Sequence, residues 1–330
     1  MGHLKLAQYL LSKILEEQHI VSISHHHYLS PKHHAGLTAF LSEQKLSAKY
    51  LEMAEKWFSP LILSILSQLE NKKNQPLIVG INGCQGSGKS TLAHYLRTIL
   101  DLEHHIGAEV LSLDDFYLSR QQRQHLANTV HPLLFTRGVP GTHDIGWLID
   151  VIKHLSNNHD KSIPLPTFNK ALDDIDTNAH RMSQPKAGVI IVEGWCLGAT
   201  AQTKNELLIP INELERNEDP KGIWRNYVND QLKGDYLTLF EHIKYWVMLK
   251  TPSFECVFDW RKEQEDKLSD KVNGSQNTGI MNDKQLRQFI AHYQRTTESC
   301  LKYLPQQVQH LFEFNKQREI IQYCQPITNK

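Results

Sequence analysis

The feature that most constrains the fold of this 330-residue chain is a glycine-rich stretch, Gly-Cys-Gln-Gly-Ser-Gly-Lys-Ser, at residues 83–90. It matches the pattern G-x-x-x-x-G-K-[ST] in full. A short apolar run precedes it at residues 77–81, and a helical pattern follows at residues 91–100. In this order, a tight turn points successive backbone N–H groups inward, and the helix N-terminus adds its dipole beneath them. The stretch therefore predicts a phosphate-binding loop at the end of a buried strand.

The chemistry of this loop assigns a role to its side chains. Lys89 has the reach to contact the β- and γ-phosphates of a nucleotide, and the Ser90 hydroxyl is a ligand for Mg²⁺. Cys84 fills a variable position of the motif, where the backbone N–H binds phosphate, so we do not interpret it as a nucleophile. The residues expected to bind the nucleotide are Gly83, Cys84, Gln85, Gly86, Ser87, Gly88, Lys89, Ser90 and Thr91.

Similar apolar runs recur at residues 110–113, 189–192, 246–249 and 311–314, with helical patterns between most of them. Strands that alternate with helices indicate a parallel sheet buried on both faces. We therefore predict an α/β fold, a P-loop NTPase parallel sheet flanked by helices. This α/β domain would span residues 76–330, and residues 1–75 would form a helical N-terminal extension.

Within that extension, the sequence predicts helices at residues 4–15 and 39–69. Pro60 is expected to end one helix and to start another. A histidine-rich stretch lies between them, and Pro31 marks a break in it. Five histidines in ten residues would suit a transition metal, but no cysteine or acid accompanies them, so a solvated or packed loop is the preferred interpretation. The histidines are His25, His26, His27, His33 and His34.

Composition excludes several classes of protein. Lys and Arg together number 36, as do Asp and Glu, and the resulting formal net charge of zero argues against a protein that coats nucleic acid or an anionic membrane. No apolar run approaches the ~20 residues of a membrane span. The N-terminus lacks the apolar segment of a secretory signal. The five cysteines are scattered and form no C-x-x-C pair, so we expect no disulfide framework and a cytoplasmic location.

Acidic residues follow two of the expected strands, at the edge where ligands bind in open α/β sheets. Asp114 and Asp115 close the run at 110–113, and Glu193 closes the run at 189–192. A hydrophobic strand that ends in a carboxylate is typical of a Mg²⁺ ligand, and such a carboxylate also accepts the proton of an attacking hydroxyl. For Asp115 a helix N-cap remains an equal alternative.

Arg261 lies in a helical pattern downstream and is a candidate to neutralise the transferring phosphoryl group from a lid. The alternative is an ordinary ion pair with Glu265 at i+4. A GTPase would carry an Asn-Lys-x-Asp motif, which is absent, because Asn169 and Lys170 are followed by Ala-Leu. The expected cofactors are therefore ATP and Mg²⁺.

Three segments together resemble a known family. They are residues 83–90, Ser-Leu-Asp-Asp-Phe-Tyr at 112–117, and Arg-Gly-x-Pro-Gly-Thr-His-Asp at 137–144. The family contains uridine kinase, phosphoribulokinase and bacterial pantothenate kinase. Residues 165–171, 192–198 and 249–254, with the Trp-Arg pair at 260–261, are most similar to the plant and fungal type of D-glycerate 3-kinase.

The resemblance implies a role for each matching residue. Asp114 takes the place of the base that deprotonates the acceptor hydroxyl, Glu193 that of the Mg²⁺-linked acid, and Arg261 falls in the lid helix. The residues on the acceptor side would be Asp115, Tyr117, Arg137, His143 and Lys170. One segment departs from the family pattern: residues 171–176 are acidic where the family often has an Arg/Gly-rich stretch. If this segment contacts the acceptor, it disfavours an anionic one.

The function expected from these features is ATP-dependent phosphorylation of a small-molecule hydroxyl, with D-glycerate converted to 3-phosphoglycerate. The alternatives are a kinase for pantothenate, a nucleoside or another sugar acid, and a nucleotide-binding regulator without kinase activity. The small-molecule acceptor is the expected partner, with neither nucleic acid nor membrane. The oligomeric state and the task of the N-terminal helices stay open.

Overall fold

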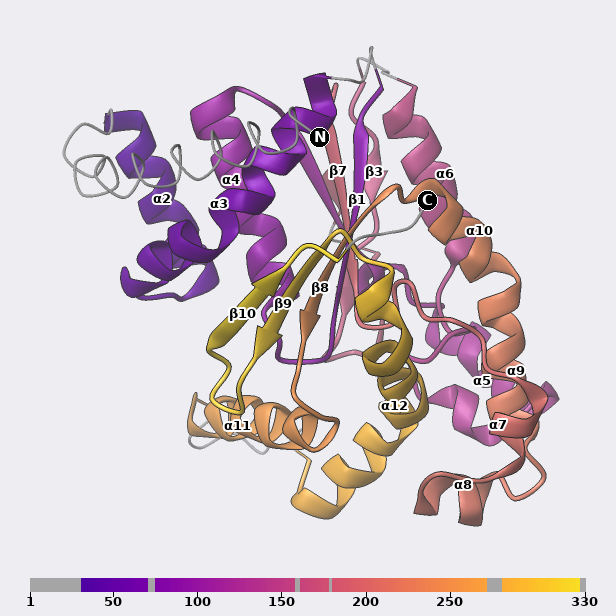
Figure 1. Ribbon diagram of the computed structural model, residues 1–330. Coiled ribbons are helices and arrows are strands. Elements are labelled where there is room, and N and C mark those ends of the chain that lie inside the picture. Colours follow the sequence, from indigo (N-terminus) through magenta and orange to yellow (C-terminus); the bar gives the residue numbers. More distant parts are fainter. Residues whose placement is uncertain (1–30, 71–74, 158–160, 178–179, 272–280, 327–330) are drawn as a thin grey trace, which may run out of the picture.

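A computed structural model describes residues 31–70, 75–157, 161–177, 180–271 and 281–326, with side chains left undescribed for Pro31 and residues 264–271. The chain folds into a six-stranded sheet with helices on both faces (Figure 1). The strand order is β10-β9-β8-β1-β7-β2. The strands are β1 (Leu77–Gly83), β2 (Ala108–Ser112), β7 (Val189–Gly194), β8 (Tyr245–Lys250), β9 (His310–Phe314) and β10 (Ile320–Cys324). The predicted α/β fold is confirmed.

Strand β1 lies at the point where the strand order reverses. It pairs in parallel with β7 on one side and with β8 on the other. The chain leaves β1 for β2, two positions away, and β7 later fills the gap. In open α/β sheets, ligands bind outside the carboxyl ends of the strands at such a switch point. The glycine-rich stretch, which directly follows β1, therefore occupies the expected binding position.

Alternating residues of the strands face two separate cores. On β7, Val189 and Ile191 belong to one buried cluster, and Ile190 and Val192 belong to the other. The first cluster is covered mainly by α2 (Pro31–Gln44), α3 (Lys49–Glu70), α4 (Lys89–His104) and α11 (Glu255–Lys271). The second is covered mainly by α6 (Ile145–Ser156) and α10 (Asp235–His242), and α12 (Asp283–Tyr303) contributes to both.

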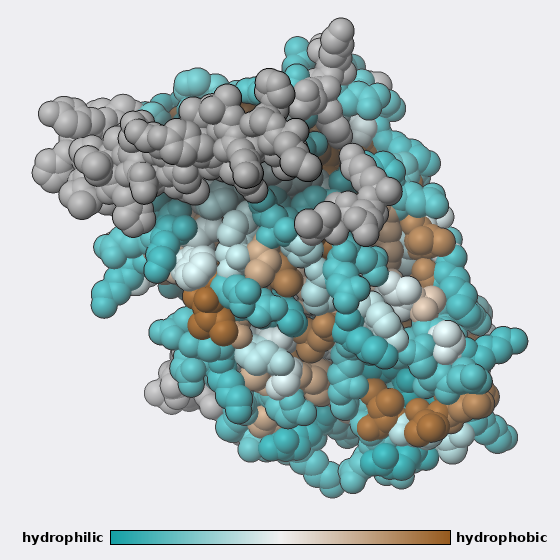
Figure 2. All heavy atoms as spheres, viewed as in Figure 1, coloured by the Kyte–Doolittle hydropathy of each residue, from teal (hydrophilic) through white to brown (hydrophobic). Residues whose placement is uncertain are grey.

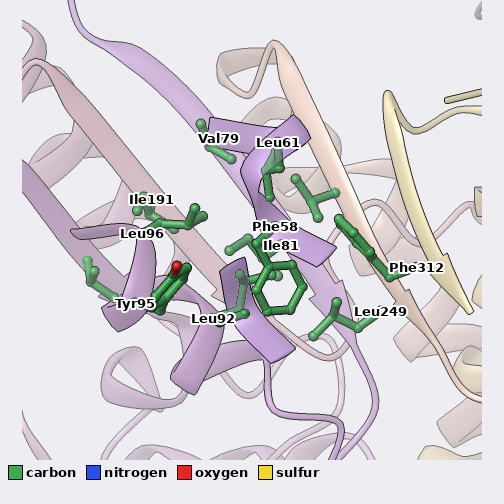
Figure 3. Close-up of a cluster of buried hydrophobic side chains, with 14 of the residues drawn as sticks. Phe58, Leu61, Val79, Ile81, Leu92, Tyr95, Leu96, Ile191, Leu249 and Phe312 are labelled. Carbon is green, nitrogen blue, oxygen red and sulfur yellow. The ribbon is translucent and has the colours of Figure 1, made fainter. Parts of the chain in front are cut away.

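Helix α3, although it lies in the N-terminal extension, packs into the same core as the central strand. Figure 3 shows Phe58 and Leu61 of α3 beside Val79 and Ile81 of β1. The Phe58 ring meets Phe312 of β9 edge-on, with ring centroids 5.1 Å apart. Each fully buried side chain of this size contributes about 1.5–3 kcal/mol to stability. The sheet therefore depends on α3 for part of its apolar cover.

The predicted helix break at Pro60 is wrong. Helix α3 runs through Pro60 without interruption, and the chain instead breaks between α2 and α3, where Lys45 has a left-handed φ of 55°. A proline inside a helix costs about 3 kcal/mol. Buried residues precede and follow Pro60 in α3, and packing of this face against the sheet outweighs the lost hydrogen bond.

Several other predictions for the N-terminal region concern residues that the structure does not describe. The helix at 4–15 and His25, His26 and His27 lie outside them, as does most of the linker near residue 71. His33 and His34 lie in helix α2 and not in a loop.

The structure also contains short segments that the sequence did not predict. Two-residue strands form two small antiparallel pairs, and strands this short leave no periodic pattern in a sequence. The pairs are β3 (Pro164–Leu165) with β6 (Arg181–Met182), and β4 (Phe168–Asn169) with β5 (Asp174–Ile175). The helical segments are η2 (Leu113–Phe116), α5 (Arg120–Thr129), η3 (Pro132–Phe135), α7 (Lys204–Leu208), α8 (Glu213–Glu218), α9 (Ile223–Lys233) and η4 (Leu304–Gln306).

The visible surface is mostly hydrophilic, with hydrophobic side chains gathered near α7, α8 and α9 (Figure 2). Leu208, Ile209 and Ile223 are among the exposed apolar residues of these elements. None of the helices in the described part of the chain is both long enough and apolar enough to cross a membrane.

Candidate active site

The phosphate loop is shaped by glycines at its two bends. Gly86 and Gly88 have φ values of 80° and 87°, in the left-handed region that favours glycine. A Cβ atom added to Gly83 would lie 2.4 Å from the Ser87 hydroxyl, so the loop closes tightly on its own first residue. The loop backbone is therefore curled as the motif predicts.

Polar groups in this loop lack partners within the described part of the chain. The buried Ser87 Oγ and Gln85 Oε1 form no hydrogen bond there, and the Gly88 N-cap of α4 has no side-chain cap. The first backbone N–H groups of a helix need a partner from outside the helix. The Ser87 hydroxyl is a donor at this helix N-terminus, and an anionic ligand such as a phosphate would satisfy it together with the first backbone N–H groups of α4.

Glu193 links the loop to the neighbouring strand. Its Oε1 accepts hydrogen bonds from Ser90 Oγ at 2.7 Å and from Ser112 Oγ at 2.8 Å. Its Oε2 lies 3.8 Å from Lys89 Nζ and has no hydrogen-bond partner in the described residues. Burial lowers the pKa of Lys89, but Glu193 and Asp114 raise it more, so the net pKa is above its ordinary value and the lysine stays charged.

The donor set beside the loop fits Mg²⁺. Ser90 supplies a hydroxyl and Glu193 a buried carboxylate, both hard oxygen ligands. Across the described residues, no group of three or more His, Cys, Asp or Glu side chains is arranged to hold a metal by itself. Mg²⁺ is ordinarily bound through one or two carboxylates together with substrate phosphates, which is the ligand set that this edge would provide.

Asp114 lies between cations at the start of the acceptor side. Its Oδ2 accepts from Lys170 Nζ at 2.7 Å, and its Oδ1 accepts from the Tyr117 hydroxyl at 2.8 Å. Burial raises the pKa of Asp114, but Lys170 and Lys89 lower it more, so the net pKa falls well below its usual range. The carboxylate is therefore ionised at any physiological pH.

Asp115 points into different surroundings, although the two acids are adjacent. Both lie in the 3₁₀ segment η2 and not on an extended strand, so the expected strand alternation does not apply to them. Asp115 accepts the backbone N–H of Phe168, and burial raises its pKa. The helix N-cap alternative is wrong, because Ser112 and Ser119 are the N-caps of η2 and α5.

Tyr117 and His143 form a stacked pair next to Asp114, with ring centroids 4.7 Å apart. The Tyr236 hydroxyl accepts from Gly141 N at 3.1 Å and forms a second hydrogen bond with His143 Nδ1 at 2.5 Å. The other ring nitrogen, Nε2, is buried without a partner in the described part of the chain. Burial lowers the pKa of His143 to about 3, so the ring stays neutral.

Arg137 completes this side of the site. Its NH1 is ion-paired with Asp173, and its guanidinium lies 5.4 Å from the centre of the Phe168 ring. The Tyr293 hydroxyl donates to the Arg137 carbonyl at 3.0 Å. Arg261 lies on α11 within electrostatic range of that hydroxyl. The alternative partner of Arg261, Glu265, lies outside the described side chains.

The residues predicted from sequence thus fall into two adjoining groups. The nucleotide group surrounds the loop and Glu193, and the acceptor group surrounds Asp114, which also acts on the pKa of Lys89. Sequence reasoning missed Ser112, Tyr236 and Asp173. Asp173 left a signal in the acidic segment 171–176, but the sequence did not show that its charge is paired with arginines.

A glycine-rich phosphate loop at the switch point of a parallel sheet, with a buried carboxylate beside its Lys-Ser pair, defines the class of P-loop nucleotide-binding proteins. Within this class, the chain is similar in sequence to kinases. The chain is 31% identical over 241 residues to the uncharacterized kinase mug58 of Schizosaccharomyces pombe, covering 70% of this chain and 83% of that one. It is 26% identical over 245 residues to TDA10 of Saccharomyces cerevisiae, described as a probable ATP-dependent kinase, with 66% and 75% covered.

Among solved structures, the D-glycerate 3-kinase of Cryptococcus neoformans superposes with a TM-score of 0.66 at 23% identity, covering 84% of this chain and 99% of that one. At this identity the likeness shows a shared fold. No family model matches the chain. The chain belongs to the family of P-loop small-molecule kinases, as its resemblance to that family predicts, and it is an ATP-dependent kinase.

Proposed function

We propose that this kinase transfers the γ-phosphoryl group of ATP to the 3-hydroxyl of D-glycerate and forms 3-phosphoglycerate. The observation that carries the proposal is the ionised Asp114, which is hydrogen-bonded by Lys170 and lies beside the charged Lys89. A hydroxyl that approaches Asp114 would be placed next to the end of the phosphate loop. The shared fold of the Cryptococcus D-glycerate 3-kinase supports this choice of acceptor.

On the nucleotide side, the backbone of the loop from Gly83 to Ser90, with Thr91 behind it, would cradle the phosphates. Lys89 would neutralise charge that develops on the transferring group. Ser90 and Glu193 would hold Mg²⁺ against the β- and γ-phosphates. When bound, the metal supplies charge neutralisation and fixes the orientation of the phosphates.

On the acceptor side, Asp114 would take the proton of the attacking hydroxyl. Its low pKa keeps it ionised, and phosphoryl transfer demands orientation of the nucleophile more than strong basicity, because the transition state is loose. Lys170 is 61% exposed in its side chain and is able to turn from Asp114 toward the carboxylate of an acceptor. Arg137 would bind the same carboxylate, and Arg261 would cap the phosphoryl group from α11.

The cations on this side favour an acid over an uncharged acceptor. Asp115, Tyr117 and His143 would shape the pocket around it. Pantothenate and sugar acids carry the same charge, whereas a nucleoside has no carboxylate for Arg137 to bind. A regulator that has lost phosphoryl transfer would not need Lys89, Ser90, Asp114 and Glu193 together in one site.

The five cysteines are free, and four of them are buried, which suits a reducing compartment. We place the reaction in the cytoplasm on this ground. Residues 76–330 would form the kinase domain, and residues 1–75 would form its extension.

The experiment that tests the proposal is ADP release with ATP and Mg²⁺ against a panel of D-glycerate, L-glycerate, pantothenate, uridine and glycerol. D-glycerate should give the highest kcat/KM, and ³¹P NMR should show a 3-phosphate product. If another acceptor gives a higher kcat/KM, that acceptor replaces D-glycerate as the proposed substrate. ADP release with none of them, from a protein that binds ATP, would favour the regulator.

A further inference from the structure

The acidic segment that departs from the family pattern contributes a carboxylate shared by two arginines. Asp173, in the turn between β4 and β5, pairs with Arg123 through Oδ2 and with Arg137 through Oδ1. We call these three residues the arginine clasp. Asp173 adopts a left-handed φ of 54°, so the turn presents its side chain from a conformation that non-glycine residues seldom adopt.

Arg123 is the fixed end of the clasp. Its side chain is fully buried in α5, and its donors are all directed at protein oxygens. Nε donates to Leu118 O at 3.1 Å, NH1 to Phe135 O at 2.7 Å, and NH2 to the Asp173 carbonyl at 2.5 Å. Arg123 is therefore unable to reach a ligand. It locks Asp173 in place, and removing the carboxylate would leave a buried charge less compensated.

Arg137 is the open end of the clasp. Its side chain is 23% exposed, and within the described residues only its NH1 donates a hydrogen bond. Phe168 supports one face of its guanidinium. A guanidinium offers five donors in a planar fork, so the remaining edge of Arg137 is available for a second carboxylate.

The clasp itself carries a net positive charge. Two arginines share one aspartate, and Arg137 is the exposed end of this group. If Asp173 paired with Arg137 alone, the two would cancel. Because Asp173 is also paired with Arg123, it leaves Arg137 able to attract a second carboxylate.

We infer that Asp173, fixed by Arg123, is a positioning residue that holds Arg137 in the orientation that binds the carboxylate of the acceptor. The inference rests on the proposed function in one respect, that the acceptor is a hydroxy acid. Asp173 itself touches no reacting atom and acts through Arg137.

The test is the effect of Asp173→Asn on acceptor and nucleotide KM, with Asp174→Asn as the matched control. Asp174, the next residue and the first of β5, carries the same charge, but its Oδ1 accepts from the backbone N of Arg120 at 2.9 Å. Asp173→Asn should raise the KM for D-glycerate about tenfold, the effect of one charge-assisted hydrogen bond. The KM for ATP should stay within about twofold. Asp174→Asn should leave both values near those of the wild type.

Asp173→Glu covers the case in which the amide variant fails to fold, because it keeps the charge that compensates Arg123. It should give a smaller rise in acceptor KM than Asp173→Asn, with the ATP KM unchanged. An unchanged acceptor KM in the folded variants would overturn the inference. A lower acceptor KM would also overturn it, since Asp173 would then compete with the acceptor for Arg137. A parallel rise in both KM values would show a merely structural role.

The wild-type panel separates this inference from the proposed function. If the wild type phosphorylates another hydroxy acid and not D-glycerate, the proposed acceptor is wrong, and the clasp is tested with that acid. If the wild type phosphorylates only uncharged acceptors, the inferred role of Asp173 is wrong. A melting-temperature shift caused by the acid, measured on the wild type and Asp173→Asn, gives a readout without turnover, and equal shifts in the two proteins count against the clasp.

Discussion

The nucleotide side and the acceptor side of the site are built in different ways. The nucleotide side is one contiguous stretch at the end of the central strand, and the neighbouring strand β7 contributes Glu193. The acceptor side is assembled from η2, the loop at residues 137–143, the β4–β5 turn and α12. The first is held by sheet hydrogen bonds, and the second by ion pairs and ring contacts between segments far apart in sequence.

This difference extends to their polar groups. The nucleotide side leaves Ser87 Oγ and Glu193 Oε2 without a hydrogen bond in the described part of the chain, whereas the acidic and basic groups of the acceptor side mostly satisfy one another. A loop anchored on rigid strands keeps its conformation even when some of its polar groups have no ligand to bind. Segments without a sheet beneath them are held in place by pairing their own charges, so we expect substitutions on the two sides to have distinct signatures.

The largest effect should come from the nucleotide side. Lys89→Ala should lower kcat by about 10³–10⁵-fold, the range for removal of a cation that stabilises the phosphoryl transition state. The fold should survive with a lower melting temperature, because the variant leaves the buried Glu193 carboxylate without its cation but does not open the apolar core. Steady-state ADP release measures the first effect and thermal melting the second. If the variant turns over at a rate near that of the wild type, Lys89 does not stabilise the transition state.

Asp114→Asn probes the junction of the two sides and should lower kcat by about 10²–10⁴-fold, the usual contribution of a general base. The KM for ATP should change little. Asp115→Asn is the matched control and should lose much less, because Asp115 faces the Phe168 backbone. Assays at several Mg²⁺ concentrations would reveal a metal-ligand role. If Asp115→Asn is inactive and Asp114→Asn remains active, Asp115 and not Asp114 is the general base.

ATP with Mg²⁺ should stabilise the protein by about 2.7 kcal/mol at a ligand concentration one hundred times Kd. If the nucleotide side forms independently of the acceptor side, Asp173→Asn should show the same melting shift as the wild type. Differential scanning calorimetry without acceptor measures both. No shift at millimolar nucleotide would contradict a nucleotide site, and a shift lost only in the variant would show that the two sides form together.

The smallest effect concerns the neutral His143 of the acceptor side. Its pKa is about 3 in the folded protein against an ordinary 6.5, so between these values the unfolded chain binds a proton that the folded one excludes. Stability should therefore fall as pH drops below 6.5, and His143 should account for about 2 kcal/mol of that loss by pH 5.

The comparison that isolates this residue is urea denaturation of the wild type and His143→Asn between pH 7 and pH 5. An asparagine keeps a polar side chain that can form a hydrogen bond with the Tyr236 hydroxyl but does not titrate, so the variant should lose less stability over this range. Other buried histidines, such as His310, affect both proteins equally. Identical pH slopes would mean that His143 is not held neutral.

The sequence alone determined the elements whose signals are local. The loop motif, the apolar runs of β1, β2, β7, β8 and β9, and the carboxylates that follow two of them are short-range patterns, and they placed the nucleotide side. The continuous helix through Pro60 escaped notice, because packing decided it against local propensity. The edge strand β10 was not predicted either, although its Ile and Tyr residues favour a strand, because its antiparallel pairing with β9 is a tertiary contact.

Only the tertiary structure decided the acceptor side. Asp114 and Lys170 are 56 residues apart, and Arg137 and Asp173 are 36 apart, and no periodic pattern joins such pairs. The acidic segment suggested repulsion of an anion, yet the fold pairs Asp173 with two arginines, so that its charge is compensated within the protein. Charge in a sequence is a sum over residues, whereas charge in a site depends on which partners the fold brings within hydrogen-bonding distance and which of them it buries.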